Sequence, residues 1–245
     1  MKIQNKQCLQ LKLQAWISLL CFPVLYPMII FWMKYIRKYR INDLKEVRHQ
    51  FSQIKSSHPG GLLICPNHLT FLDSMLLIWA FSNPLTYAFN YRTMCWNLPK
   101  ASHVQESWLY RSVCYLGKCL LITADAKQSQ QTMEQASYLL NSGQYVMVFP
   151  EGTRSKTGRI NTENFIYGVG KLHVDSMPKE LLCVYLRGKS QQSSSKMPIK
   201  SEQFHIQMQL VTITTTMTGR RAMRDVSTQM IEQLVKMEEN YLSQY

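Results

Sequence analysis

The stretch Tyr145-Val146-Met147-Val148-Phe149-Pro150-Glu151-Gly152-Thr153-Arg154 decides how this chain folds. Its first half is a short apolar run of β-branched and aromatic residues, which is typical of a buried strand. Pro150 and Gly152 then interrupt the pattern, so the strand is expected to open into a sharp turn. The turn presents Glu151 and Arg154 at the end of a strand, where α/β proteins commonly place their reactive groups.

A second strand-to-loop element lies upstream, where a predicted strand at residues 62–65 is followed by Asn67-His68-Leu69-Thr70-Phe71-Leu72-Asp73. His68 is a candidate general base, because the pKa of histidine suits proton abstraction near neutral pH. Asp73, at the expected start of the next helix, would orient the imidazole and stabilise the imidazolium. The protein needs no Ser or Cys nucleophile if a hydroxyl group of a bound substrate is itself the attacking nucleophile. Alone, the spacing also fits a loop histidine beside a helix-capping aspartate.

The turn after the first strand is suited to an anionic ligand. Arg154 offers a planar fork of donors for phosphate or carboxylate. Gly152 allows close approach of the backbone to a ligand. Glu151 is expected to accept hydrogen bonds from hydroxyl groups of an acceptor or to pair with a nearby base, and Lys156 and Arg159 add positive charge. The alternative is a surface turn closed by a salt bridge between Glu151 and Arg154.

Together, the Asn-His-x4-Asp and Glu-Gly-Thr-Arg motifs resemble those of the glycerolipid and lysophospholipid acyltransferases, in particular 1-acylglycerol-3-phosphate acyltransferases. The resemblance extends over residues 60–187. It implies that His68 and Asp73 are the catalytic pair. It also implies an acceptor-binding set, which comprises Glu151, Gly152, Thr153 and Arg154.

The resemblance further implies a donor, an acceptor and a membrane. The donor would be acyl-CoA or acyl carrier protein, and the acceptor a lysophospholipid, such as lysophosphatidic acid, or a related lipid. A thioester is already activated, so neither a metal nor an organic cofactor is expected. The rival hypothesis is a lipid-binding or scaffold member of the same fold with weak or no turnover.

Three positions depart from the family pattern. The strand that should end in an arginine ends at Ala124, and the nearest cations, Lys118 and Lys127, are not placed equivalently. Ile166 stands where the family has a lysine, and the later strand at residues 182–186 lacks the family's proline. Because two cationic groups are missing, acyl transfer remains the expected reaction but the acceptor headgroup stays open.

The bulk composition predicts one folded domain behind an appended segment. The chain has 245 residues and 46% hydrophobic content, which argues against disorder. We expect a membrane-anchoring segment at residues 1–41 and an acyltransferase domain at residues 42–245. The seven cysteines are scattered and form no Cys-x2-Cys pair, which indicates neither a disulfide framework nor a zinc site. The catalytic part is therefore expected to face the cytosol.

The N-terminal region combines positive charge with a long apolar run. Nine of the Lys and Arg residues, but only two carboxylates, lie in residues 1–48. Residues 15–33 carry no charge and would span roughly 28 Å as a helix. Pro23 and Pro27 would kink or break it, so both a single membrane span and a re-entrant hairpin remain open. A buried core helix is the alternative. Nucleic-acid binding is not expected, because the charges flank the apolar run rather than interleave with it.

The remaining pattern predicts an α/β layered domain, with a central sheet flanked by helices and preceded by the hydrophobic membrane helix or helical hairpin. Strands are expected at residues 62–65, 86–90, 119–123, 145–149, 181–186 and 205–213. Helices are expected at residues 42–55, 72–81, 106–116, 129–141, 168–174 and 221–241. Asn42 is the expected N-cap of the first of these helices. The Ser-rich residues 188–201 are interpreted as a flexible surface loop.

Overall fold

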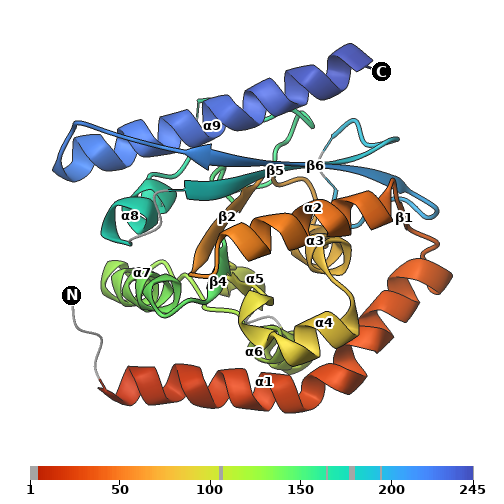
Figure 1. Ribbon diagram of the computed structural model, residues 1–245, viewed down its shortest axis with the longest axis horizontal. Helices are drawn as coiled ribbons and strands as arrows, with labels where there is room; N and C mark the ends of the chain where they lie inside the picture. Colours follow the sequence, from red (N-terminus) through yellow and green to blue (C-terminus); the bar gives the residue numbers. More distant parts are fainter. Residues whose placement is uncertain (1–4, 105–106, 164, 177–179, 194, 245) are drawn as a thin grey trace.

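A six-stranded sheet with helices on both faces forms the centre of the molecule (Figure 1). The computed structural model describes residues 5–104, 107–163, 165–176, 180–193 and 195–244. The strands, in their order across the sheet, are β1 (Arg40–Ile41), β6 (Gln203–Thr212), β5 (Glu180–Gly188), β2 (Leu62–Pro66), β4 (Tyr145–Met147) and β3 (Trp96–Asn97). All neighbours pair in parallel except β5 and β6. The predicted α/β class is confirmed.

Strand β2 lies at the centre and is buried along its whole length. Alternate side chains of a strand point to opposite faces, so Leu63 and Cys65 enter one core while Leu62 and Ile64 enter the other. This explains why parallel central strands are continuously apolar. The first core is covered by α7 (Ala126–Asn141), α8 (Gly168–Asp175) and α9 (Gly219–Gln244). The second is covered by α2 (Leu44–Ser57) and α3 (Asp73–Phe81).

The N-terminal apolar run forms one long helix, α1 (Asn5–Phe31), which continues as the π-helical turn η1 (Trp32–Ile36). In the part of the chain that the structure describes, this is the one helix long and apolar enough to cross a membrane. Pro23 and Pro27 lie inside it. Figure 1 shows that the helix bends without reversing direction, so the chain forms a bent helix and not a hairpin. It lies beside α4 (Pro84–Phe89) and α6 (Trp108–Leu116).

The strand expected at residues 86–90 is wrong, because this segment belongs to helix α4. The side-chain oxygen of Asn83 accepts a hydrogen bond from the Thr86 N–H at 2.8 Å, and Pro84 occupies the first turn. Both residues favour a helix start. The N-cap and Pro84 therefore outweigh the strand propensity of the β-branched and aromatic residues in this segment.

Three further expectations need correction. Residues 119–123 form no named strand but only two isolated bridges, which pair Asn97 with Cys119 and Lys100 with Ile122. Asn42 does not cap α2, since its N–H donates to the Phe204 carbonyl at the sheet edge and the helix begins at Leu44. The helix expected from residue 106 begins at Trp108, and residue 106 itself lies outside the described residues.

Candidate active site

The site lies where two neighbouring strands end. Strands β2 and β4 are parallel and adjacent, so their carboxyl ends, and the loops that follow, meet at one edge of the sheet. Asn67, the first residue after β2, is buried and bonds the main chain of Leu186 in β5 through both ends of its amide, at 2.7 and 3.0 Å. This clamp fixes the direction in which the chain leaves the sheet toward His68.

His68 and Asp73 form a hydrogen-bonded pair, with 3.0 Å between Nδ1 and Oδ2. The imidazole ring stacks on Phe149, at 4.2 Å between ring centres, and is one-fifth exposed. A neutral imidazole whose Nδ1–H donates to a carboxylate presents Nε2 as its basic nitrogen. His68 lines an apolar cavity of about 570 Å³. Nε2 is therefore the nitrogen available to a molecule bound there.

Asp73 is buried and is held by its own loop. Its Oδ2 also accepts the N–H groups of Leu69, at 2.6 Å, and Thr70, at 2.8 Å. The Thr70 hydroxyl donates to Oδ1 at 2.5 Å. Hydrogen-bond donors to both oxygens fix the orientation of this carboxylate. The geometry therefore gives the imidazole a rigid acceptor on its Nδ1 side.

Glu151 holds the main chain of His68. Its Oε1 accepts the His68 N–H at 2.8 Å, and its Oε2 accepts the Asn161 N–H at 3.1 Å. The His68 carbonyl in turn accepts the Ser155 N–H at 2.9 Å. Burial raises the pKa of Glu151 to about 7, against the lowering effect of its two N–H donors. Glu151 does not line the cavity, so a direct contact with substrate stays a prediction.

Gly152 and Thr153 follow on the cavity side of the same loop. Gly152 has a φ of 66°, and a Cβ atom there would lie 2.5 Å from the side chain of Ile166. Glycine is therefore required both by the backbone conformation and by the close packing. Ile166, which stands where the family pattern has a lysine, closes this part of the cavity with an apolar side chain.

Arg154 lies at the same end of the cavity as His68. Its guanidinium carbon is 4.0 Å from the ring centre of Phe71, and Nη1 donates to the Ser195 carbonyl at 3.2 Å. Stacking on an aromatic ring holds the guanidinium plane in place. The alternative of a Glu151–Arg154 salt bridge is wrong, because Glu151 accepts the N–H groups of His68 and Asn161 and Arg154 donates to Ser195.

The loop interpreted as flexible is bonded to this site. The Phe71 N–H donates to the Lys196 carbonyl at 3.2 Å, and the Ser195 N–H donates to the Leu69 carbonyl at 3.3 Å. Together with the Arg154 contact, these bonds tie the described part of residues 189–201 to both motif loops. The low-complexity composition therefore did not reveal that this segment packs on the site.

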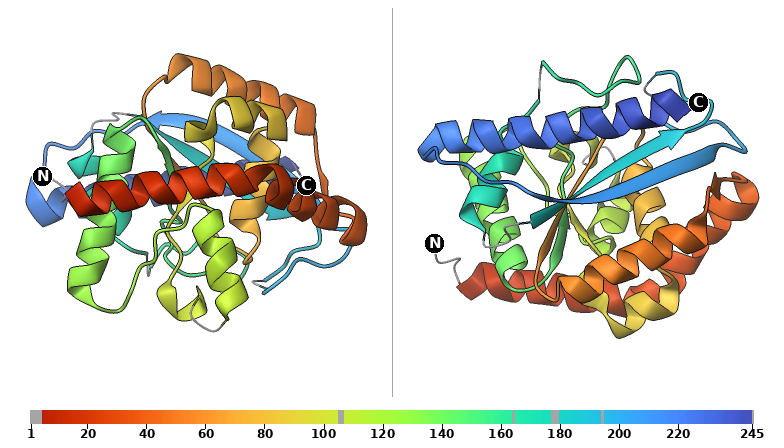
Figure 2. Two further views of the ribbon diagram at one scale, coloured as in Figure 1. Left: turned by 90° about the horizontal axis from the view of Figure 1, so that it is seen from below. Right: turned by 45° about the horizontal axis from the view of Figure 1, so that its top comes forward.

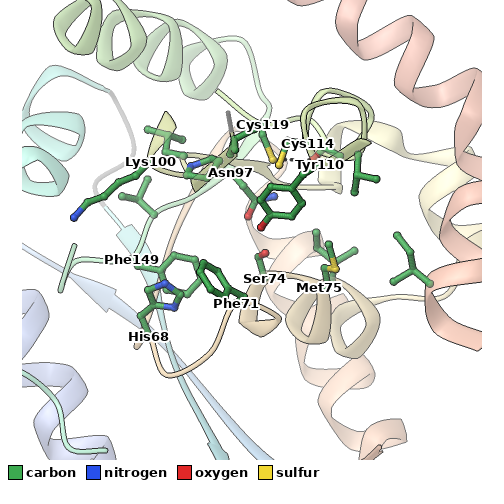
Figure 3. A pocket seen from close by; sticks show the side chains of 18 of the residues that line it. His68, Phe71, Ser74, Met75, Asn97, Lys100, Tyr110, Cys114, Cys119 and Phe149 are labelled. Atoms are coloured by element: carbon green, nitrogen blue, oxygen red, sulfur yellow. Dashed lines mark hydrogen bonds between the residues drawn. The ribbon is translucent and has the colours of Figure 1, made fainter. Parts of the chain in front are cut away.

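An apolar cavity of about 570 Å³ leads away from His68 (Figure 3). Figure 3 shows His68, Phe71 and Phe149 together on one side, with Tyr110, Cys114 and Cys119 across from them. Helix α1 completes the wall with apolar side chains. They include Phe22, Leu25, Ile29 and Ile30, and Met33 of η1 adjoins them. The size and lining suit a long apolar ligand whose polar end meets His68.

Among the residues that the structure describes, the Lys and Arg side chains that line the cavity are Arg154, Lys156 and Lys100. Lys100 was missed by sequence reasoning. It pairs with Ile122, two residues before Ala124, where the family arginine is absent. Figure 3 shows Lys100 beside Asn97, across from His68, with its amine directed away from the other labelled side chains. No local sequence signal identifies it, because its position depends on the pairing of two short segments.

Lys118 is unsuited to replace the missing arginine. Its side chain is fully buried, and Nζ donates to the carbonyls of Met94, at 2.6 Å, and Tyr91, at 3.2 Å. Burial lowers the pKa of Lys118 to about 7. The amine thus fastens the turn behind the cavity wall. Lys127 is exposed on α7, away from the lining residues.

Comparison with known families identifies one match. The profile of a family described as Acyltransferase matches residues 46–219, which include both motif loops and all strands except β1. Among the residues that the structure describes, no three His, Cys, Asp or Glu side chains gather as metal ligands would.

Proposed function

The chain belongs to the Acyltransferase family, and from that premise we propose that it is a membrane-associated O-acyltransferase. It moves a fatty acyl chain from acyl-CoA or acyl carrier protein to a hydroxyl of a lysophospholipid or a related lipid. The observation that carries this proposal is the His68–Asp73 pair at one end of a large apolar cavity. The cavity supplies a place for the acyl chain, and the pair supplies the base.

In the proposed reaction, Nε2 of His68 takes the proton of the acceptor hydroxyl. The hydroxyl oxygen attacks the thioester carbonyl and forms a tetrahedral intermediate. Asp73 stabilises the imidazolium through Nδ1. When the carbon–sulfur bond breaks, the leaving thiolate takes the proton back from His68, so the ester and the free thiol are released and the base is regenerated.

The acceptor is proposed to carry an anionic group. Arg154, Lys100 and Lys156 line the cavity, and Arg154 stacks on Phe71 in the loop of His68, which supports a phosphate-bearing lysolipid as acceptor. Lysophosphatidic acid is one member of this class. Because Ala124 and Ile166 lack the charge of the family pattern, phosphodiester and amino-acid headgroups are also expected to be accepted.

The N-terminal segment, residues 1–41, is proposed to attach the acyltransferase domain, residues 42–245, to the cytoplasmic face of a membrane. The apolar composition of α1 supports this. The segment also contributes to the cavity wall, so attachment and substrate binding are coupled through one helix.

Release of free thiol from acyl-CoA, measured with a panel of lysolipids, tests the proposal. Wild type is expected to release thiol only with an acceptor present, and His68→Ala to be slower by roughly two to four orders of magnitude. His58→Ala is the matched control, because His58 also pairs with a carboxylate, that of Glu180, but does not line the cavity. A folded His68→Ala protein within about tenfold of wild type would exclude the mechanism.

The second candidate is a lipid-binding member without turnover, and the missing charges at positions 124 and 166 favour it. It predicts lipid binding with no thiol release for any acceptor. The same panel therefore separates the two functions.

A further inference from the structure

Helix α1 is fastened along the domain by polar side chains on one face. Gln14 Nε2 donates to the carbonyls of Tyr115, at 3.0 Å, and Cys119, at 3.1 Å. The Tyr26 hydroxyl lies 3.0 Å from the Ser82 carbonyl, and Ser18 bonds the Leu116 carbonyl. A helix that left the domain to cross a bilayer would leave these groups without partners in hydrocarbon. The contacts place α1 flat against the protein.

The opposite face of α1 is an exposed apolar stripe. Its residues recur every three or four positions and are each more than half exposed: Leu9, Leu13, Trp16, Leu20, Val24, Met28, Phe31 and Tyr35. This spacing defines one side of a helix. Single exposed apolar residues are normal on protein surfaces, but a contiguous stripe of this length marks an interaction surface.

Two neighbouring helices extend this stripe on both sides. Figure 2 (left) shows α1 lying across one face of the molecule, with α4 on one side of it and α6 on the other. Phe89 of α4 is 90% exposed and Trp108 of α6 is 76% exposed, with Leu85 and Leu109 beside them. None of these four side chains lines the cavity. Their exposure therefore has no explanation in the proposed active site.

The four helical segments of this face carry charge of one sign. The sequences of α1, η1, α4 and α6 contain no Asp or Glu. The cations on and between these helices are exposed and include Lys6, Lys12, Lys34, Arg92 and Arg111. By contrast, α9 on the far layer has mixed charge, with four carboxylates at residues 225, 232, 238 and 239 and four cations at residues 220, 221, 224 and 236. Apolar helices that carry exposed cations and no carboxylate of their own are complementary to an anionic lipid leaflet.

We propose that α1, α4 and α6 form one surface that lies in the plane of an anionic leaflet, with Phe89 and Trp108 inserted on either side of α1. This extends the proposed membrane association from an anchor segment to a defined face of the domain. The inner sides of α1 and α6 line the cavity. A lipid chain in the leaflet therefore enters the cavity past these helices without crossing water.

Flotation with vesicles of equal parts phosphatidylcholine and phosphatidylserine tests the surface. The double variant Phe89→Ser/Trp108→Ser keeps α1 unchanged and is expected to partition roughly ten- to a hundredfold more weakly than wild type. Met217→Ser/Leu242→Ser removes two exposed apolar side chains at the ends of the far layer and is the matched control. It is expected to stay within about twofold of wild type. Equal partitioning of wild type and Phe89→Ser/Trp108→Ser would overturn the proposal.

Three further measurements complete the test. Bromine-labelled lipids should quench wild-type fluorescence more than that of Trp108→Phe, and equal quenching would overturn the insertion of Trp108. Binding to pure phosphatidylcholine vesicles as tight as to the mixed vesicles would overturn the requirement for an anionic leaflet. Thiol release in detergent micelles should be unchanged in Phe89→Ser/Trp108→Ser. If wild type releases no thiol but still floats as expected, the proposed enzyme activity fails while the surface stands.

Discussion

The two ends of the cavity are built in different ways. At the His68 end, directional hydrogen bonds fix the polar groups. The Asn67 side chain bonds the main chain of β5, Asp73 accepts N–H groups of its own loop, and Glu151 accepts the main-chain N–H of His68. At the α1 end, the wall consists of apolar side chains such as Leu25 and Ile29, whose contacts are not directional.

The difference teaches what each end is sensitive to. At the polar end, replacing one carboxylate oxygen by an amide nitrogen alters which atoms donate and accept hydrogen bonds. The rate of the reaction should therefore change, while the shape of the cavity does not. At the apolar end, a change of volume should decide which chain fits, with the chemistry left intact. Substitutions at the two ends should therefore affect separate kinetic properties.

Asp73→Asn breaks the polar end most directly. The amide keeps the shape of the side chain but is neutral, and it cannot accept from all four donors. Turnover is expected to fall by roughly two to four orders of magnitude. Asp125→Asn is the control, because Asp125 caps the start of α7 without a histidine and asparagine caps equally well. Activity of folded Asp73→Asn within about tenfold of wild type would contradict the polar-end assignment.

Arg154→Ala and Lys100→Ala sharpen the comparison within the polar end. A charge-assisted contact to phosphate contributes about 1.5–3 kcal/mol, so Arg154→Ala should lower kcat/KM for the acceptor roughly ten- to a hundredfold. Arg154→Lys should recover only part of this, since an ammonium has no planar fork. Lys100→Ala should have a smaller effect of about fivefold, with Lys127→Ala as the control. An unchanged kcat/KM for the acceptor in Arg154→Ala would contradict the assignment of Arg154 to the acceptor site.

Leu25→Trp tests the apolar end. Leu25 lines the cavity, and a larger side chain should exclude long chains while short chains still fit. The ratio of palmitoyl to octanoyl transfer is expected to fall about tenfold, with octanoyl turnover retained. Leu20→Trp makes the same exchange on the exposed side of the same helix and should leave the ratio unchanged. A uniform loss for both chains would show that the variant disturbs the fold and not the chain site.

The comparison also shows which parts of the fold could be predicted. Strands β2 and β5 were found because a strand buried on both faces leaves a continuous apolar run. Strands β1 and β3 have two residues each, and their strand character depends on the neighbours with which they pair. The same holds for residues 119–123, whose expected strand is reduced to two bridges.

Within the site, the sequence indicated the pairing of His68 with Asp73 but not the partners of Glu151. His68 and Asp73 are close along the chain, so their contact follows from local geometry. Glu151 accepts the main-chain N–H groups of His68 and Asn161. Such contacts cannot be predicted from residue types, because every residue except proline carries the same N–H group. Lys100 was missed for a related reason, since the pairing with Ile122 brings it to the site.

Glu151→Gln is expected to affect turnover least and to appear in the pH dependence of stability. The folded state raises the pKa of Glu151 to about 7, mainly through burial. Nearby carboxylates, Asp73 and Glu238, act in the same direction. A raised folded pKa means that the native state binds more protons than the unfolded state, so this contribution to stability is fully present below pH 4.5 and is lost as pH rises through 7.

The free energy of unfolding of wild type should therefore fall relative to that of Glu151→Gln between about pH 5 and 8, by up to about 3 kcal/mol. Urea unfolding of both proteins across this range measures the difference, in which the contributions of other titrating groups cancel. The amide also places an NH₂ group against one of the two main-chain N–H donors, which costs about 1–3 kcal/mol at every pH and does not alter the slope. A difference that stays constant with pH would show that Glu151 is ionised throughout and that its two N–H donors outweigh its burial.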